Sequence, residues 1–197
     1  MQIKQLLNEG KRKLIENNIE DACIQTRTLM QFILNKEQVY LIANGEKELD
    51  NEQEEAFNKG VFKIISGVPI QYITNSQEFM KLKFYVDENV LIPQPDTEIL
   101  VEEAIKILKE KTFQKNKINI LDLCTGSGAI IVSLGKELEK ISEKYNFYGT
   151  DISEKAIEIA QKNASSNNVN VKFYLGDLFE SINVNEKFDL IVSNPPY

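Results

Sequence analysis

The sequence contains no histidine and no tryptophan among its 197 residues. Without an imidazole, neither a Ser-His-Asp nor a Cys-His nucleophile system can be built, which excludes most hydrolase mechanisms that rely on a near-neutral base. The two cysteines, Cys23 and Cys124, lie far apart and neither has a CxxC partner. We therefore predict no disulfide framework and no metal site.

Long apolar runs are also absent: no stretch approaches the length needed to cross a bilayer, and residues 1–13 lack the apolar segment of a signal peptide. Arginine is scarce and the net charge is −7, which argues against a large phosphate-binding surface. We expect a folded cytoplasmic protein that binds no membrane and forms no stable complex with nucleic acid.

The first third of the chain has helical periodicity. From Ile3 to about Ser66 apolar residues recur at helical spacing, which predicts three or four short helices. After Gly67-Val68-Pro69 the pattern changes to short β-rich runs, and we expect a hairpin turned at Asp87-Glu88-Asn89 between residues 79–86 and 90–92. The predicted organisation is a small N-terminal all-α helical domain (1–70), a β-hairpin linker (71–95) and an α/β domain (96–197).

The last part of the chain alternates between buried strands and helices. An acidic first turn at Asp96-Thr97-Glu98 predicts one helix, and Gly128 and Ser153 each begin another. The predicted strands cover residues 118–123, 147–150, 171–175 and 188–192. Such alternation predicts a Rossmann-like α/β fold with a parallel sheet and right-handed crossovers.

A glycine-rich segment, Asp122 to Ala129, follows the first of these strands and opens a helix, as in sites where the backbone approaches a nucleotide-like ligand. Asp151 ends the next strand, where a carboxylate can accept hydrogen bonds from ribose hydroxyls. Ile131 takes the place of the third glycine of the nicotinamide fingerprint, so S-adenosyl-L-methionine fits better than NAD. Gly176-Asp177 ends the following strand, where methyltransferases commonly place an acid near adenine. Taken singly, each feature also has a purely structural interpretation as a turn or a surface acid.

The final turn, Asn194-Pro195-Pro196-Tyr197, follows the strand that ends at Ser193. Two prolines fix the backbone and leave carbonyls as acceptors. An amide or exocyclic amine could donate its two N–H groups to the Asn194 side-chain oxygen and the Pro195 carbonyl, which would localise the nitrogen lone pair and aim it at a methyl sulfonium. The Tyr197 ring could pack on the planar acceptor group. This chemistry requires no basic side chain, in agreement with the missing histidine.

Four motifs together resemble one family: Gly67-Val-Pro-Ile-Gln-Tyr72, Leu91-Ile-Pro-Gln-Pro-Asp-Thr-Glu98, Leu121-Asp-Leu-Cys-Thr-Gly-Ser-Gly128 and Ser193-Asn-Pro-Pro-Tyr197. They are similar to the peptide chain release factor glutamine N5-methyltransferases (the HemK/PrmC family). The resemblance implies methyl transfer from S-adenosyl-L-methionine to the side-chain amide nitrogen of the glutamine in the Gly-Gly-Gln motif of peptide chain release factors. It also implies that the helical domain is a substrate-binding domain.

The resemblance assigns roles to particular residues. The cofactor would contact Cys124, Thr125, Gly126, Ser127 and Gly128 with its methionine part, Asp151 with its ribose, and Asp177 and Leu178 with its adenine. The catalytic residues would be Asn194, Pro195, Pro196 and Tyr197, with Asn194 also near the cofactor. The sequence departs from the family at three positions: Cys124 replaces a usual glycine, Leu178 a common aromatic, and Gln94 a usual arginine. Because Gln94 is neutral where the family usually has a positive charge, an ion pair or substrate contact of that arginine does not carry over to the Pro93-Gln94-Pro95 loop.

The resemblance also implies a seven-stranded sheet, of which only the first four strands are encoded, in the spatial order 3-2-1-4. We therefore expect a truncated methyltransferase fold whose C-terminal part is missing, which alone is inactive or nearly so and self-associates through its exposed sheet edge. Two alternatives stay open. One is a methyltransferase of exocyclic amines in DNA or RNA bases, against which the acidic composition and the Pro-Gln-Pro-Asp-Thr-Glu loop count. The other is a non-catalytic fragment that retains only docking or cofactor binding.

Overall fold

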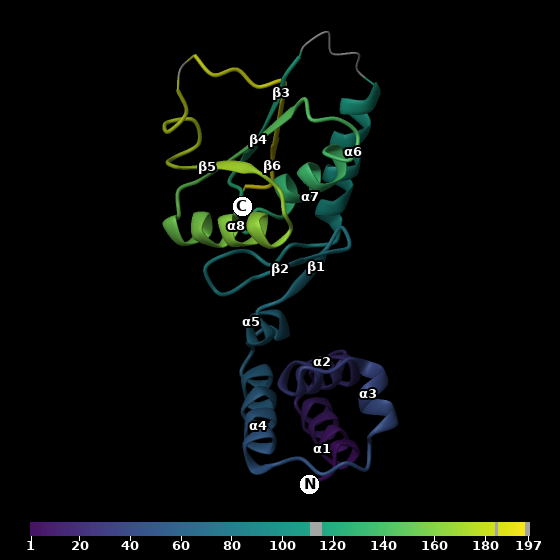
Figure 1. The fold of residues 1–197 in the computed structure, drawn as a ribbon. Coiled ribbons are helices and arrows are strands. Elements are labelled where there is room, and N and C mark those ends of the chain that lie inside the picture. Colours follow the sequence, from purple (N-terminus) through teal and green to yellow (C-terminus); the bar gives the residue numbers. More distant parts are fainter. Residues whose placement is uncertain (111–115, 184, 196–197) are drawn as a thin grey trace. The chain divides into compact units, whose positions relative to one another are not determined.

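The computed structural model describes residues 1–110, 116–183 and 185–195 (Figure 1). The chain forms two compact units, Met1–Asn75 and Ser76–Tyr197, which are described separately below. Residues 71–95 divide between these units. Pro196 and Tyr197 of the predicted acceptor turn lie outside the described residues, so the turn is followed only as far as Pro195.

The first unit is helical. Its helices are α1 (Ile3–Glu16), α2 (Ala22–Leu34), α3 (Gln38–Ala43), α4 (Asn51–Ile65) and α5 (Ile70–Thr74). The prediction of three or four helices between Ile3 and about Ser66 is confirmed by α1 to α4. The expected change to β-rich runs directly after Gly67-Val68-Pro69 was wrong, because this segment interrupts the helical region and α5 follows it. Pro69 caps the start of α5, a position where a missing backbone N–H costs little.

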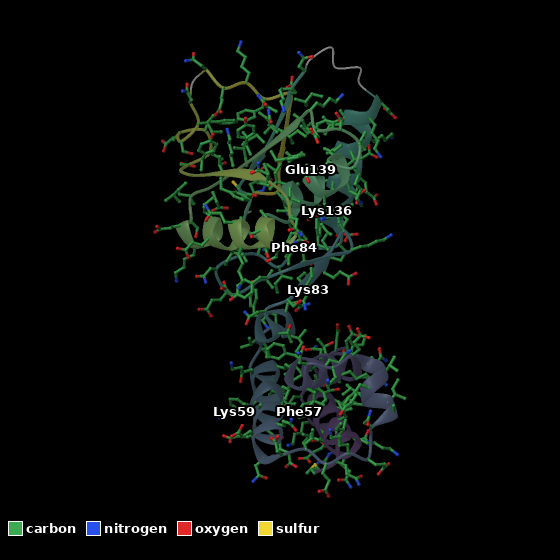
Figure 2. The ribbon with its side chains drawn as sticks, viewed as in Figure 1. Phe57, Lys59, Lys83, Phe84, Lys136 and Glu139 are labelled. Atoms are coloured by element: carbon green, nitrogen blue, oxygen red, sulfur yellow. The ribbon has the colours of Figure 1, made fainter. Side chains whose placement is uncertain are left out.

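The core of this unit depends on close helix packing around Phe57, which is fully buried (Figure 2). A Cβ atom on Gly10 of α1 would lie 2.7 Å from Cε1 of Phe57, and one on Gly60 of α4 would lie 2.6 Å from Cδ1 of Leu29. Both glycines therefore let helix backbones approach side chains of a neighbouring helix. Asp50 caps α4, where its Oδ1 accepts a hydrogen bond from the Gln53 amide at 2.8 Å.

The second unit is built on a parallel sheet. Its strands are β3 (Ile118–Leu123), β4 (Tyr145–Asp151), β5 (Val171–Leu175) and β6 (Leu190–Ser193). Among the described residues their order is β5-β4-β3-β6, which confirms the predicted order 3-2-1-4. The helices α6 (Asp96–Glu110), α7 (Ala129–Leu138) and α8 (Glu154–Ser166) lie beside the sheet (Figure 1). Their apolar side chains share one hydrophobic core with it. The α/β class is thus confirmed.

A short hairpin also belongs to the second unit, but its position was predicted wrongly. Strands β1 (Gln77–Phe79) and β2 (Leu82–Phe84) pair as antiparallel partners and turn at Met80-Lys81 instead of at residues 87–89. Met80 and Lys81 have φ of 49° and 61°, the left-handed pair that a two-residue hairpin turn needs. Since Asn-Gly or Asp-Gly usually signals such a turn, this turn leaves no recognisable pattern in the sequence. Phe79 and Phe84 anchor the hairpin in the core, edge to face at 6.2 Å.

None of the helices within the described ranges is both long and apolar enough to cross a membrane.

Candidate functional site

The turn between β3 and α7 has an unusual backbone. Cys124, Gly126 and Gly128 all have left-handed φ, of 59°, 54° and 78°. A Cβ on Gly126 would meet no atom within 4 Å, so its backbone faces open space, whereas one on Gly128 would lie 3.1 Å from the Cβ of Ala160 on α8. Gly128 is therefore needed for close packing, and Gly126 leaves room for a ligand beside the backbone. We call residues 124–128 the cofactor loop.

The end of β4 holds the cofactor loop in place. Asp151 accepts the Gly126 amide at 2.8 Å through Oδ2 and the Ser153 amide at 3.0 Å through Oδ1. The Thr125 amide donates to the Thr150 carbonyl at 2.8 Å. These bonds fix the direction of the Asp151 carboxylate, and each of its oxygens keeps a lone pair that can accept a ribose hydroxyl.

A buried carboxyl group lies under the same loop. Asp122 of β3 is fully buried, and its Oδ2 accepts the Thr125 hydroxyl at 2.7 Å. Its Oδ1 has no hydrogen-bond partner among the described residues. Burial raises the pKa of Asp122 to about 7, and the Asp151 carboxylate adds to the rise, while the Thr125 hydroxyl and the Ile131 amide act in the opposite direction. No separate role was predicted for Asp122, although an acidic residue inside an apolar strand is itself a signal of a functional or structural site.

A second buried side chain ties the loop to the segment after the hairpin. Asn163 of α8 is 1% exposed; its Oδ1 accepts the Tyr85 amide at 2.7 Å, and its Nδ2 donates to the Tyr85 carbonyl at 2.9 Å and the Ser127 carbonyl at 2.8 Å. All of its side-chain hydrogen-bonding groups are thus used. Nothing in the local sequence marked Asn163, because its partners lie 36 and 78 residues away.

The acceptor residues follow β6, next to the cofactor loop. The Ser193 hydroxyl donates to the Leu123 carbonyl at 2.8 Å, and Asn194 Nδ2 donates to the Thr97 hydroxyl at 3.3 Å. With its nitrogen held by Thr97, the Asn194 amide keeps its oxygen without a hydrogen-bond partner within the described ranges, and this oxygen is the acceptor that the predicted chemistry requires. Thr97 was predicted only as part of a helix start, and its contact with Asn194 was missed.

The segment before α6 is fixed by its own side chains. Glu98 Oε1 accepts the Met80 amide of the hairpin turn at 2.6 Å, so this acid serves both the first turn of α6 and the hairpin. Gln94 donates through Nε2 to the Ile92 carbonyl at 3.0 Å. The Pro-Gln-Pro-Asp-Thr-Glu motif thus connects the hairpin with the acceptor residues.

A small cavity of about 60 Å³ joins these parts of the second unit. It is lined by Phe79, Leu91, Pro93, Gln94, Thr97, Cys124, Thr125, Gly126, Ser127, Ala129, Ile130 and Asn194. Four predicted cofactor residues and the first acceptor residue therefore share one hollow. Burial raises the pKa of the Cys124 thiol, and the Asp151 and Asp122 carboxylates add to this, so the thiol stays neutral near pH 7.

The predicted adenine residues lie elsewhere, in the turn after β5. Asp177 and Leu178 are exposed and do not line the cavity, although the Gly176 amide donates to the Asp151 carbonyl at 3.0 Å and so brings this turn beside Asp151. Leu178 is 49% exposed with a φ of 48°. The neighbouring Phe179 is 51% exposed and supplies an aromatic ring one residue after the position where the family commonly has one.

Comparison with known proteins identifies both units. Residues 5–74 match the PrmC N-terminal domain, and residues 114–196 match a methyltransferase domain. The release factor glutamine methyltransferase of Clostridium acetobutylicum is 37% identical over 100% of this chain and 67% of its own length. The chain belongs to the release factor glutamine methyltransferase family. The predicted family is thereby confirmed.

Other relatives in this family agree. The release factor glutamine methyltransferase of Haemophilus influenzae is 36% identical over 100% of this chain and 69% of its own. The chain thus spans about two thirds of the length of these relatives. Among solved structures, the 16S rRNA N2 G1207 methyltransferase of T. thermophilus matches 62% of this chain and 32% of its own with a TM-score of 0.51 and 21% identity. That likeness shows a shared fold and says nothing about the substrate.

Proposed function

We propose that this chain binds S-adenosyl-L-methionine on the cofactor loop and holds the glutamine of a release factor's Gly-Gly-Gln motif at Asn194, for methylation of the side-chain amide nitrogen. The observation that carries the proposal is the shared cavity, in which Cys124 to Ser127 and Asn194 line the same hollow. Family membership supplies the substrate class, because the matched relatives are named for this activity.

The cofactor loop fits a ligand with a nucleoside and an amino-acid part. The open space beside Gly126 admits a ligand against the backbone. The cofactor loop, with its left-handed φ at Cys124, Gly126 and Gly128, is held by the hydrogen bond from the Gly126 amide to the Asp151 carboxylate. Asp151 would also accept the ribose hydroxyls, and the turn at Asp177 and Leu178, hydrogen-bonded to the Asp151 carbonyl through Gly176, would flank the adenine. S-adenosylmethionine, when bound, supplies a methyl group on an electrophilic sulfonium.

The acceptor residues compensate for the poor nucleophilicity of an amide nitrogen. That nitrogen's lone pair is delocalised into its carbonyl, and two hydrogen bonds from its N–H groups favour the geometry in which the lone pair is available. Asn194 Oδ1 would accept one N–H group and the Pro195 carbonyl the other. Thr97 keeps Oδ1 pointed at the substrate because it occupies the Asn194 nitrogen. The roles of Pro196 and Tyr197 stay predictions from the sequence.

Calorimetric titration with S-adenosylmethionine tests the cofactor half of the proposal. We expect saturable binding by the wild-type chain, and at least tenfold weaker binding after Asp151→Ala, which removes both the loop anchor and the ribose acceptor. Glu102→Ala, an exposed acid on α6, is the matched control and should bind like the wild type. Absence of binding by the wild type, or equal affinities for wild type and Asp151→Ala, would refute the assigned cofactor site.

Mass analysis of the release factor's Gly-Gly-Gln peptide, after incubation with S-adenosylmethionine and this protein, tests the acceptor half of the proposal. One methyl group on the glutamine side chain is the expected result. A nucleobase substrate would instead leave the peptide unmodified and place the methyl group on added RNA or DNA.

A further inference from the structure

Gln94 lines the same cavity as Asn194, but the proposed methyl-transfer chemistry gives it no role. Its side chain is exposed, and its Nε2 donates a hydrogen bond to the Ile92 carbonyl at 3.0 Å. Because a carbonyl can only accept, this contact fixes the orientation of the amide and occupies its nitrogen. The other end, Oε1, has no hydrogen-bond partner within the described ranges and is therefore an oriented acceptor.

The backbone around Gln94 is held on both sides, so its side chain starts from a fixed position. A proline on either side restricts the backbone angles. The Pro93 carbonyl accepts Nε2 of Gln77 at 3.2 Å, and the Gln94 carbonyl accepts the Thr97 amide at 3.0 Å. Thr97 also binds the Asn194 side-chain nitrogen. The backbone of Gln94 and the side chain of Asn194 are thus tied to the same residue.

Gln94 and Asn194 present their amide groups in the same way. In each, a contact within the protein occupies the nitrogen, and the oxygen has no partner in the described part of the chain. Both side chains line one cavity of about 60 Å³. The proposed chemistry uses the Asn194 oxygen for one N–H group of the reacting amide and leaves the Gln94 oxygen unassigned. A second acceptor in the same cavity suits a second donor on the same substrate.

The absence of charge in the cavity narrows the kind of donor. Within the described ranges, none of the residues that line it is acidic or basic, so no cation there could neutralise a phosphate. A neutral peptide fits such a surface, because its main-chain N–H groups are donors and glycines carry no side chain that would keep its backbone away from Gln94. Arginine, which is usual at this position in the family, has donors only and could not accept an N–H group.

We propose that Gln94 Oε1 accepts a main-chain N–H group of the Gly-Gly-Gln segment and so binds the backbone beside the reacting glutamine. The identity of the substrate rests on the proposed function. Gln94 would hold a part of the peptide that does not react, so its hydrogen bond is equally strong in the ground state and in the transition state. Its loss should raise KM and leave kcat nearly unchanged, whereas a distorted Thr97–Asn194 contact would lower kcat.

The test is steady-state methylation of a Gly-Gly-Gln peptide and of three derivatives, in each of which an ester oxygen replaces one main-chain N–H group of the motif. Gln94→Leu removes the acceptor from an exposed position and should raise KM for the parent peptide about fivefold, with kcat within about twofold of the wild type. Gln161→Leu, which changes an exposed glutamine on α8 outside the cavity, is the matched control and should behave like the wild type.

The ester derivatives identify the hydrogen bond itself. One of them should lower kcat/KM of the wild type about fivefold and that of Gln94→Leu by less than about twofold, because the variant has already lost the hydrogen bond. Esters that affect both proteins equally, or a Gln94→Leu variant with lowered kcat and unchanged KM, would refute this role of Gln94 and leave the proposed function standing. If the wild type methylates no peptide glutamine, the proposed function fails, and the role of Gln94 with it.

Calorimetry separates a lost substrate contact from a damaged site. The affinity for S-adenosylmethionine should be the same in the wild type, Gln94→Leu and Gln161→Leu, because Gln94 makes no hydrogen bond to the cofactor loop within the described ranges. A weaker affinity in Gln94→Leu would show that the change disturbs the cofactor loop, and would overturn the assignment of Oε1 to the peptide backbone.

Discussion

Replacing Asn163 with aspartate tests the hydrogen bonds that Asn163 makes to Tyr85 and Ser127. The two side chains have nearly the same shape, so the change affects these hydrogen bonds and hardly alters the packing. The variant keeps an acceptor for the Tyr85 amide but loses both donors, so the Tyr85 and Ser127 carbonyls lose their partners. It also places a carboxyl group at a position that is 1% exposed. Each buried acceptor left without a donor costs about 1 to 3 kcal/mol. We expect a loss of about 3 kcal/mol in the free energy of unfolding.

The consequence should reach the cofactor, because Ser127 belongs to the cofactor loop. Urea unfolding followed by circular dichroism would measure the free energy of unfolding, and calorimetry would measure the affinity for S-adenosylmethionine. A displaced cofactor loop that costs about 1.4 kcal/mol of binding free energy should lower this affinity about tenfold. Asn167→Asp is the matched control. Its Nδ2 donates to the Lys83 carbonyl at 3.1 Å and to the Asn163 backbone carbonyl at 2.9 Å, but from a partly exposed position where water can replace the lost donor, so a loss below about 1 kcal/mol is expected. An Asn163→Asp variant within about 0.5 kcal/mol of the wild type, with unchanged cofactor affinity, would refute this account of the link.

Four further predictions follow from single contacts. The native state keeps Asp122 protonated up to about pH 7, so it binds more protons than the unfolded state, and the free energy of unfolding should fall as pH rises from about 4 to about 7. Asp122→Asn should flatten this pH dependence, measured by urea unfolding at several pH values. An unchanged pH dependence would contradict the raised pKa of Asp122. Gly128→Ala should cost about 2 kcal/mol in thermal unfolding because of its left-handed φ and its contact with α8, whereas Gly45→Ala, with ordinary contacts, should cost under about 1 kcal/mol. Thr97→Val should lower kcat several-fold and leave S-adenosylmethionine affinity intact; an unchanged kcat would remove Thr97 from the acceptor site. Strand β6 pairs only with β3 among the described residues, so its other edge is free to pair with a second copy of the chain. We predict concentration-dependent association through this edge, measured by light scattering and weakened by Ile191→Lys. A monomer at all concentrations would contradict this prediction.

The parallel sheet was predictable because its strands are apolar runs between turn signals. Strands β3 and β5 have the predicted bounds, and β4 begins two residues earlier and ends one residue later. The cofactor loop was predictable for a related reason, since its glycines and the acid that ends β4 occur at fixed places relative to the strands. In these cases the determining interactions are local or follow from strand geometry.

The side-chain contacts that complete the site were not predictable. Thr97 meets Asn194 across 97 residues, and Asn163 meets Tyr85 across 78, so that no local pattern signals either pair. The hairpin failed for a different reason: Met80 and Lys81 adopt left-handed backbone angles that neither residue type favours, and the Glu98 carboxylate stabilises that turn from a separate segment. Tertiary contacts in each case override or extend the local preference.

The most direct test of the acceptor role of Asn194 compares the wild-type protein with its Asn194→Ala variant, by mass analysis of the release factor's Gly-Gly-Gln peptide after incubation with S-adenosylmethionine. We predict a methyl group on the glutamine side chain with the wild type and none with the variant, while the variant's affinity for S-adenosylmethionine stays within about threefold, equivalent to less than 1 kcal/mol. Methylation by Asn194→Ala at the wild-type rate, or an unmodified glutamine with the wild type, would contradict this role.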